Sequence, residues 1–248
     1  STGTDTVSAL DVIDQFYACP PEYFLGGSVP ATEHSVMCMG QQAGELETIE
    51  RIATKLYPSG IVSVVSDTWD FFQVITTHLQ ALKPKILARQ DDANGNSKYV
   101  SRPDSGDPFK ILCGDTDAII GSPEYKGAIR CLLEGFETTT NSLGFTVMNR
   151  KVGLIYGDGI TLKVAYQVLD WCYRNRICTS CIVFGIGSYT YQGVTRDTLG
   201  QAIKSTFGIV NGVGRELFKD PKTDSGMKKS ARGLLRVEKE GDDFVLYD

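Results

Sequence analysis

Four short apolar runs in this chain each end in a burst of Gly, Ser, Asp or Arg, and a helix-like segment lies beside each of them. The runs span residues 61–65, 99–102, 152–156 and 181–184. Short apolar runs that alternate with helices are typical of parallel strands in a β/α barrel. In such barrels the working residues sit at the carboxyl ends of the strands. The sequence therefore nominates one site that is built from segments far apart in the chain.

Helix-like periodicity fills the stretches between and around these runs. Apolar side chains recur every three or four residues in six segments, which is the spacing of an amphipathic helix. The six segments lie near residues 10–17, 46–56, 71–82, 125–133, 162–172 and 199–207. Five strands are predicted when residues 207–210 are included, and weaker strand patterns lie at residues 35–39 and upstream of Gly3. Since a closed barrel usually has about eight strands, we expect an irregular α/β barrel or one that lacks its N-terminal part.

The amino-acid composition of the chain changes after Asp220. Residues 221–233 are rich in Lys, Ser and Gly, which predicts a flexible basic loop. Residues 234–237 and 244–247 flank a short polar turn and predict a C-terminal β-hairpin. The sequence has no internal repeat and no linker composition, so residues 1–248 are expected to form one catalytic domain.

The bulk composition limits the partners. A chain of 248 residues can bury a sizeable core, and its net charge of −5 gives no general attraction to nucleic acid or to acidic membranes. Any phosphate must therefore be bound by local Arg and Lys residues or by backbone N–H groups. No apolar run is long enough to span a bilayer, and the start lacks a signal-peptide pattern, so we expect a cytoplasmic protein. Because the chain does not begin with Met, we expect upstream residues to have been removed or to lie outside it.

The seven cysteines are an odd number and predict reduced thiols rather than a disulfide framework. Cys172, Cys178 and Cys181 form the one cluster that we weigh as metal ligands. Cys178 and Cys181 have the spacing of a zinc knuckle, but no second pair of this kind follows. Cys172 fits an apolar helix stripe and Cys181 opens a strand, so a structural role is favoured and no metal ligands are predicted.

Residues 102–106, Arg-Pro-Asp-Ser-Gly, are the most specific local signal. Pro103 favours an extended backbone at Arg102 and ends the strand, so that the next residues turn over the barrel mouth. Asp104 can accept hydrogen bonds from a sugar diol or hold a hydrated Mg²⁺, and Arg102 can bind a phosphate or stack on a flat ring. The alternative is a surface turn with an Arg–Asp ion pair of little energetic value. Beside three similar strand ends, the functional interpretation is favoured.

Two further strand ends carry glycines. Gly157-Asp158-Gly159 places an acid directly before a helix N-terminus, where anions bind well, although the same residues also form ordinary turns. Residues 185–188, Gly-Ile-Gly-Ser, offer backbone N–H groups to a phosphate, and Arg196 follows to supply charge. This is not a dinucleotide-binding fingerprint, because the third glycine and the acid on a second strand are missing.

The chain has only two histidines. His34 lies in a polar loop interrupted by Pro30, and it is a candidate general base or phosphate acceptor. A packed or solvated histidine is the alternative. His78 lies beside Leu79 in a helical segment and is expected to be structural.

Eight motifs, in their order and approximate spacing along nearly the whole chain, resemble the nicotinamide phosphoribosyltransferase family. They are Gly3-Thr4-Asp5-Thr6-Val7, Ser28-Val29-Pro30-Ala31 with Glu33-His34, Val64-Val65-Ser66-Asp67, Arg102-Pro103-Asp104-Ser105-Gly106, Gly157-Asp158-Gly159, Phe184-Gly185-Ile186-Gly187-Ser188-Tyr189, Thr195-Arg196-Asp197 and Phe218-Lys219-Asp220-Pro221. The residues around Gly187 are similar to the bacterial and phage branch. The resemblance implies an irregular α/β barrel of the type II phosphoribosyltransferase kind. Because the family's enzymes are about twice this length, it also implies that this catalytic barrel portion is incomplete at its N-terminus.

The resemblance implies transfer of a phosphoribosyl group from 5-phosphoribosyl pyrophosphate to nicotinamide, in NAD salvage. Asp5 would accept a hydrogen bond from the carboxamide and repel the carboxylate of nicotinate. Ser28 and Ser66 would line the base and ribose pocket. Arg102 and Asp104 would hold the base and the ribose hydroxyls.

The remaining roles that the resemblance implies concern phosphate and charge. Asp158 would bind ribose, while Gly157, Gly187 and Ser188 would present their backbone to the 5′-phosphate. Arg196 would neutralise phosphate, in a homodimer that shares its active sites.

His34 would be phosphorylated by ATP, which acts in the family as an activating co-substrate. Mg²⁺ would accompany the pyrophosphate and stabilise the separation of charge as the ribose becomes cation-like.

Three rival functions stay open at this point. Nicotinate phosphoribosyltransferase shares the fold, and Asp5 argues against it. A non-catalytic module that binds phosphoribosyl groups or nucleotides would retain ligand without making pyrophosphate. A Schiff-base aldolase barrel is the weakest of the three, because no lysine lies at the strand ends named above.

Overall fold

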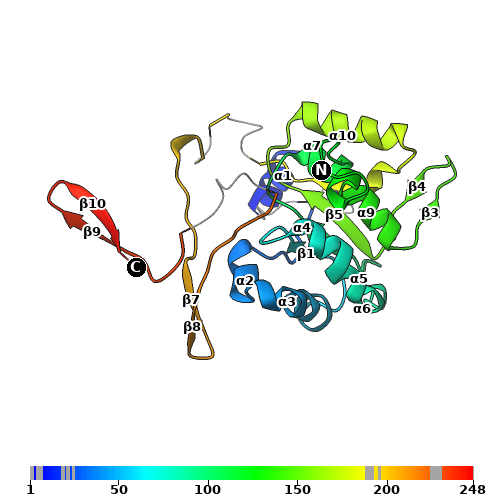
Figure 1. Cartoon of the computed structure of the whole chain (residues 1–248). Coiled ribbons are helices and arrows are strands. Elements are labelled where there is room, and N and C mark those ends of the chain that lie inside the picture. Colours follow the sequence, from blue (N-terminus) through cyan, green and yellow to red (C-terminus); the bar gives the residue numbers. More distant parts are fainter. Residues whose placement is uncertain are drawn as a thin grey trace.

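A four-stranded parallel sheet forms the centre of the molecule (Figure 1). The structure, a computed structural model, describes residues 3, 8–17, 20, 23, 26–187, 193, 194, 197–223 and 231–247. The four strands follow the order β1 (Val62–Val65), β2 (Tyr99–Arg102), β5 (Val152–Tyr156) and β6 (Ile182–Phe184). They coincide with the four apolar runs from which the sheet was predicted, and all neighbouring pairs are parallel.

The register brings the carboxyl ends of the strands to one edge of the sheet. Val65 pairs with Arg102 at the ends of β1 and β2, and Tyr156 pairs with Phe184 at the ends of β5 and β6. Isolated parallel bridges continue the sheet beyond β1, since Ala31 pairs with Ser63 and Gly3 pairs with Gly27. The polar residues that follow the strands therefore meet at one place, as predicted.

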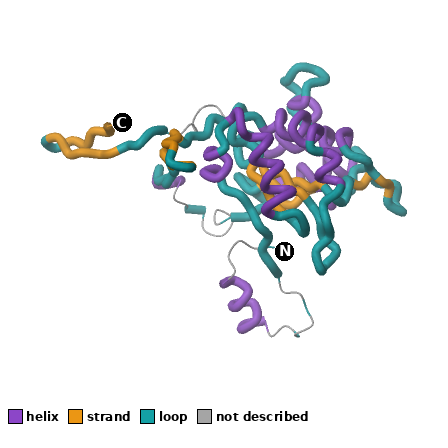
Figure 2. Tube along the Cα trace, turned by 90° about the horizontal axis from the view of Figure 1, so that it is seen from below, coloured by secondary structure: helices purple, strands orange, loops and turns teal. Residues whose placement is uncertain are grey.

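Helices pack around the sheet, as Figures 1 and 2 show from two directions. Their N-terminal turns are closed by local acceptors: Asp70, Asp107, Ser122 and Thr161 each accept a hydrogen bond from a backbone N–H three residues on. The helical elements are α1 (Ser8–Tyr17), α2 (His34–Met39), η1 (Gln42–Gly44), α3 (Glu45–Arg51), η2 (Ile52–Leu56), α4 (Phe71–Gln73), η3 (Val74–His78), α5 (Leu79–Ala81), α6 (Lys83–Leu87), α7 (Pro108–Cys113), α8 (Pro123–Lys126), α9 (Ala128–Gly135), α10 (Leu162–Arg174), η4 (Thr179–Cys181) and η5 (Asp197–Leu199). None of the described helices is both long and apolar enough to cross a membrane.

The core lies between the sheet and these helices. Its largest fully buried side chains come from both layers: Tyr99, Tyr156, Phe71, Met37, Ile49, Ile52, Ile75, Leu79, Ile86, Leu112, Ile129 and Leu132. Burial of one such side chain stabilises the fold by about 2 kcal/mol. The helices are thus fixed by packing on the sheet, and their N-caps add smaller terms.

Three antiparallel hairpins complete the described structure. They are β3 (Thr139–Thr140) with β4 (Thr146–Val147), β7 (Phe207–Val210) with β8 (Val213–Glu216), and β9 (Arg236–Glu240) with β10 (Asp243–Tyr247). The last confirms the predicted C-terminal hairpin, and it stands away from the body in both views (Figures 1 and 2). The protein is therefore a mixed α/β fold with a parallel sheet and short hairpins.

Three sequence predictions are wrong. Residues 35–39, weighed as a strand, lie in α2. The helix expected at residues 199–207 is absent from this described stretch beyond the short η5, because Gly200 has a φ of 66°, Ile203 is 95% exposed and Phe207 begins β7. Finally, β7 pairs with β8 and does not join the parallel sheet. The apolar spacing of 199–207 imitates a helix, but the described structure gives that stretch nothing to pack against.

Candidate active site at the carboxyl edge of the sheet

His34 is the centre of a charged cluster. Its Nε2 atom lies 3.4 Å from Lys219 Nζ, 3.6 Å from Asp104 Oδ2 and 3.9 Å from Asp67 Oδ1. Its Nδ1 atom lies 3.5 Å from Thr68 Oγ1. The imidazole side chain is 18% exposed, so one part of the ring meets solvent while the rest is surrounded by charge. This arrangement suits a histidine that exchanges a proton or a phosphoryl group.

The segment before His34 runs parallel to β1 and is hydrogen-bonded to it. Ser63 N donates to Pro30 O over 2.9 Å, and Thr32 N donates to Ser63 O over 2.9 Å. The Thr32 hydroxyl oxygen also accepts a hydrogen bond from Val65 N at 2.9 Å. Because α2 begins immediately after this segment, the first residue of the helix is held over the strand ends.

Asp67 is a fully buried carboxylate directly after β1. Its Oδ2 atom accepts hydrogen bonds from Asp104 N at 2.9 Å and from Ser105 Oγ at 2.5 Å. Its Oδ1 atom has no hydrogen-bond partner among the described residues and faces His34. A buried carboxylate oxygen without a donor is costly, so this atom is suited to bind a cation or a ligand hydroxyl.

Arg102 ends β2 and reaches back toward the segment before His34. Its Nη2 atom donates to Thr32 O over 3.2 Å and lies 3.5 Å from Glu33 Oε2. The side chain is 16% exposed, and its buried Nε finds no acceptor among the residues that the structure describes. The guanidinium is thus positioned at the strand end with donor capacity that a phosphate or a ring substituent can use.

Tyr156 supports the turn that carries Asp104. The Tyr156 hydroxyl lies 2.9 Å from Ser105 O and 3.0 Å from Gly106 O, and it donates to this pair of carbonyls. Burial raises the pKa of the Tyr156 phenol, and neighbouring carboxylates, Asp158 first, raise it further. Both effects favour the protonated phenol, which acts as the hydrogen-bond donor to the two carbonyls.

The C-terminal part of the chain closes over the same turn. Gly106 has a φ of 85°, and a Cβ atom there would lie 2.7 Å from Thr223 O. The Thr223 hydroxyl lies 2.5 Å from Ser105 Oγ. Only glycine permits both this backbone conformation and this close approach.

The ends of β5 and β6 meet through their glycines. Gly185 N donates to Tyr156 O over 2.8 Å, and a Cβ atom on Gly185 would lie 2.8 Å from Gly157 Cα. Asp158 and Gly187 follow these two strands and are exposed at the same edge. The structure therefore brings the two glycine motifs to the edge that carries His34, as the barrel pattern predicts.

The other predicted site residues are buried, exposed or outside the described part of the chain. Ser66 is fully buried and its hydroxyl donates to Val64 O at 2.7 Å, so in this conformation the group is used within the chain. Ser28 is exposed in the extended segment that follows Gly27. Asp5, Ser188 and Arg196 lie outside the described residues.

Sequence reasoning gave no role to several residues that the structure places here: Asp67, Thr68, Tyr156, Lys219 and Thr223. Asp67 was recognised at a strand end, and Lys219 lies in one of the eight motifs. Both signals were present, since an acid directly after a buried strand is a recurring site position. Thr223 had no such signal, because it lies in a segment predicted to be a flexible loop.

The three cysteines that were weighed as metal ligands lie in different surroundings. Cys172 and Cys181 are buried, and the half-buried Cys178 has its Sγ 3.1 Å from Ser180 Oγ. Among the residues that the structure describes, no group of three His, Cys, Asp or Glu is placed to hold a metal ion.

Comparison with known proteins defines the class. Residues 2–245 match the model of the nicotinate phosphoribosyltransferase (NAPRTase) family. The chain belongs to this family.

Three similar curated proteins are each named nicotinamide phosphoribosyltransferase. The protein of Acinetobacter baylyi is 56% identical over 246 residues, which cover 99% of this chain and 48% of the relative. The protein of Mycoplasma pneumoniae is 37% identical over 84% of this chain and 46% of the relative. The protein of Xanthomonas campestris is 32% identical over 95% of this chain and 46% of the relative. The chain thus spans about half the length of the curated relatives that it matches.

Proposed function

We propose that this chain carries out phosphoribosyl transfer from 5-phosphoribosyl pyrophosphate to nicotinamide, giving nicotinamide mononucleotide and pyrophosphate in NAD salvage. The observation that carries the proposal is His34 held among Asp67, Asp104 and Lys219 at the carboxyl edge of the sheet. Membership of the family and the names of the similar proteins support it. The proposal treats the chain as the part of the enzyme that handles ribose and phosphate.

The reaction requires charge stabilisation more than proton transfer. The pyridine nitrogen of nicotinamide brings its own lone pair to C1 of the ribose, and the bond from C1 to the pyrophosphate oxygen breaks. The electron pair of that bond leaves with pyrophosphate, so the ribose becomes cation-like. Asp104 and Asp158 are the carboxylates proposed to stabilise the ribose, and Arg102 and Lys219 are the cations proposed for the phosphates.

Mg²⁺ is the metal that we propose for this site. When bound, it would neutralise the departing pyrophosphate. The unpartnered Oδ1 of Asp67 and the carboxylate of Asp104 both approach His34, and carboxylate oxygens are the ligands that Mg²⁺ prefers. These two residues would hold the ion together with oxygens of the substrate.

We propose that ATP phosphorylates His34. A neutral imidazole nitrogen would take the γ-phosphoryl group, ADP would leave, and the ring proton would pass to solvent. Lys219 Nζ lies 3.4 Å from His34 Nε2, a position from which its charge can pair with a phosphoryl group on that nitrogen. The modified histidine would order the pyrophosphate subsite.

The selectivity for nicotinamide is assigned to Asp5. This residue lies two positions after Gly3, which bridges to Gly27 beside the segment that leads to His34. A carboxylate there would accept a hydrogen bond from the carboxamide and oppose the carboxylate of nicotinate.

The proposal also covers the complete architecture. The four-stranded sheet, extended by the bridges at Ala31 and Gly27, is proposed to be an arc of an irregular barrel. We propose that residues 1–248 act as one domain in the cytoplasm, in a homodimer that shares its active sites with Arg196 contributing to phosphate binding.

Mass spectrometry of the products tests the function. The protein is incubated with 5-phosphoribosyl pyrophosphate, Mg²⁺, and equal amounts of nicotinamide and nicotinate. Nicotinamide mononucleotide with stoichiometric pyrophosphate is the expected result, and ATP should raise its yield. Predominant nicotinate mononucleotide would overturn the role of Asp5. Binding of 5-phosphoribosyl pyrophosphate without any product would show that this chain is a non-catalytic binding module.

A further inference from the structure

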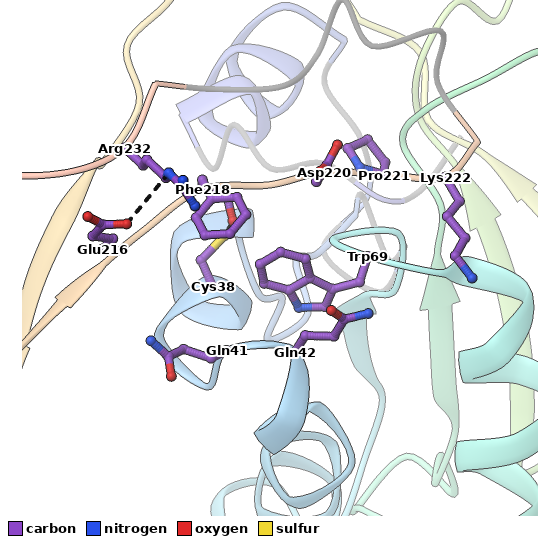
Figure 3. Close-up of a pocket in the computed structure, with 10 residues that line it drawn as sticks. All are labelled: Cys38, Gln41, Gln42, Trp69, Glu216, Phe218, Asp220, Pro221, Lys222 and Arg232. Carbon is purple, nitrogen blue, oxygen red and sulfur yellow. Dashed lines mark hydrogen bonds and ion pairs between the residues drawn. The ribbon is translucent and has the colours of Figure 1, made fainter.

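A pocket of about 810 Å³ lies beside the segment that carries Phe218 and Asp220 (Figure 3). Lys219 extends toward His34, whereas its neighbours Phe218 and Asp220 line the pocket. The volume is in the range of small-molecule sites. The other lining residues come from α2 and the turn and η1 that follow it, from the loop after β1, and from β8 and the chain after it: Cys38, Gln41, Gln42, Trp69, Glu216, Pro221, Lys222 and Arg232.

One wall of the pocket is aromatic. The rings of Trp69 and Phe218 lie 5.2 Å apart at an angle of 82°. The guanidinium of Arg232 lies over the Phe218 ring, 5.2 Å from its centroid. Figure 3 shows these three side chains around one opening, with the amide of Gln42 beside the indole. Flat rings stack well on such surfaces, since aromatic pairs prefer offset or edge-to-face contacts at these separations.

Trp69 carries an unused donor. Its Nε1–H is buried, and no described residue accepts a hydrogen bond from it. A buried indole N–H usually has a partner. This donor points to a ligand that brings its own acceptor, such as a ring nitrogen or a carbonyl oxygen.

The charges at the rim are paired within the chain. Arg232 lies 3.6 Å from Glu216, and Lys222 lies 2.5 Å from Asp70. The lining contains two acids, Glu216 and Asp220, and two bases, so its net charge is zero. A phosphate would therefore have to break existing ion pairs, which favours an uncharged ligand.

We infer that this pocket is a second binding site, separate from the His34 cluster. Its ligand is an uncharged molecule of nucleoside size that carries a heteroaromatic ring with a hydrogen-bond acceptor on its edge. The ligand ring stacks on Phe218 and meets the indole of Trp69 edge-on, because the two aromatic rings are nearly perpendicular. Trp69 Nε1 then donates to the acceptor on the ring's edge, and the Gln42 amide pairs with a neighbouring edge group. Phe218 and Lys219 are adjacent in the chain, and Lys219 lies beside His34. A ligand that shifts Phe218 therefore also shifts the backbone that positions Lys219.

Tryptophan fluorescence tests the inference directly, with adenosine as the probe. The chain has two tryptophans, Trp69 and Trp171, so the Trp171→Phe variant leaves Trp69 as the only indole. Adenosine is expected to quench this variant saturably, and to leave the Trp69→Phe variant, which keeps Trp171, unquenched. In the Trp171→Phe background, Gln42→Leu should weaken the affinity roughly five-fold, which corresponds to the loss of one neutral hydrogen bond.

The catalytic cluster provides the second control. Quenching should persist with saturating 5-phosphoribosyl pyrophosphate, and it should persist in the Asp104→Asn variant. No saturable quenching by millimolar adenosine would overturn the inference. Quenching that is abolished by 5-phosphoribosyl pyrophosphate or by Asp104→Asn would overturn it as well, because the ring would then occupy the catalytic site. Far-ultraviolet circular dichroism of each variant confirms that the fold is retained.

Discussion

The body of the molecule, residues 26–187, and the C-terminal arm, residues 206–223 and 231–247, are built in different ways. The body buries strands between helices, whereas β9 is exposed along its whole length and β7 and β8 are exposed or half-buried. Yet the arm supplies Lys219 and Thr223 to the site. The difference teaches that a site residue can be delivered by a segment with almost no core of its own.

A few contacts hold the arm on the body. Asp220 N donates to Thr68 O over 3.1 Å, and Lys222 N donates to Trp69 O over 2.9 Å. The Cys38 thiol donates to Phe218 O at 3.0 Å. These bonds join the loop after β1 and helix α2 to one stretch of the arm, so the position of Lys219 depends on them.

The largest expected effect concerns the core of the body. Leu132→Ala removes a fully buried side chain of α9 and should lower the free energy of unfolding by about 3 kcal/mol through the lost burial and the cavity. The matched change in the arm is Leu246→Ala at a side chain that is 57% exposed, and it should cost less than about 0.5 kcal/mol. Urea unfolding measures both. Equal losses would mean that the arm and the body share one core.

The next effect is at the contact between body and arm. Gly106→Ala should cost about 2 kcal/mol, because alanine disfavours a φ of 85° and its Cβ would meet Thr223 O. The control is Gly95→Ala, which has a φ of 76° and no atom within 4 Å, and it should cost about 1 kcal/mol. Hydrogen exchange should show faster exchange in residues 217–222 only for Gly106→Ala. Unchanged exchange in residues 217–222 would argue that the contact between Gly106 and Thr223 does not hold the arm on the body.

A smaller effect is expected on catalysis. If the proposed function holds, Lys219→Gln should reduce kcat/KM for 5-phosphoribosyl pyrophosphate roughly ten-fold or more, because the variant loses the one charged hydrogen bond to phosphate proposed for Lys219. The fold should remain intact, since the backbone bonds of Asp220 and Lys222 do not involve this side chain. Lys239→Gln on β9 is the matched control and should be silent. A silent Lys219→Gln would show that the arm lies near the site without acting in it.

A further effect on stability is a dependence on pH at Cys38. Burial raises the pKa of the Cys38 thiol to about 11 from its ordinary value of 9.0. A raised thiol pKa stabilises the folded state below the unfolded pKa, and this stabilisation is lost as the pH rises from about 9 toward 11. Stability should therefore fall through this window, and Cys38→Ser should flatten the slope. A slope that is unchanged by Cys38→Ser would mean that other groups govern it.

The two thiol environments also predict reactivity. The pKa of Cys178 is lowered by its hydrogen bond to Ser180, and the side chain is half-buried. Iodoacetamide at pH 8 should therefore modify Cys178 well before Cys38. Peptide mass spectrometry of a time course reads the order, and early modification of Cys38 would indicate that the arm opens readily.

The body was largely predictable from the sequence, because its signals are local. Short apolar runs predicted β1, β2, β5 and β6, and amphipathic segments predicted α1, α3, α9 and α10. Helices α2, α6 and α7 were not predicted. The meeting of the strand ends follows from parallel pairing, so the positions of Arg102, Asp104 and Gly157 in the candidate site were predictable as well.

The arm was not predictable to the same degree. Residues 199–207 have helical spacing without a surface to cover, and the pairing of β7 with β8 is fixed by the turn at Asn211, which has a φ of 51°. The role of Thr223 depends on contacts with residues more than one hundred positions away. Long-range contacts of this kind leave no periodic trace in the sequence. The position of Asp67 after a buried strand was visible in the sequence. The orientation of its carboxylate toward Asp104 N was not, because it depends on the register of β1 on β2.

The close approach of Gly185 to Gly157 has a consequence for how the site can change over evolution. The two strand ends leave no room for a side chain between them, because a Cβ on Gly185 would lie 2.8 Å from Gly157 Cα. Any side chain at Gly185 would act as a wedge that forces β6 away from β5 at its end. The close spacing of β5 and β6 at this point therefore depends on the absence of a Cβ atom at Gly185. A lineage that gained a larger residue there would have to widen the whole mouth of the sheet, and with it the set of substrates that fit.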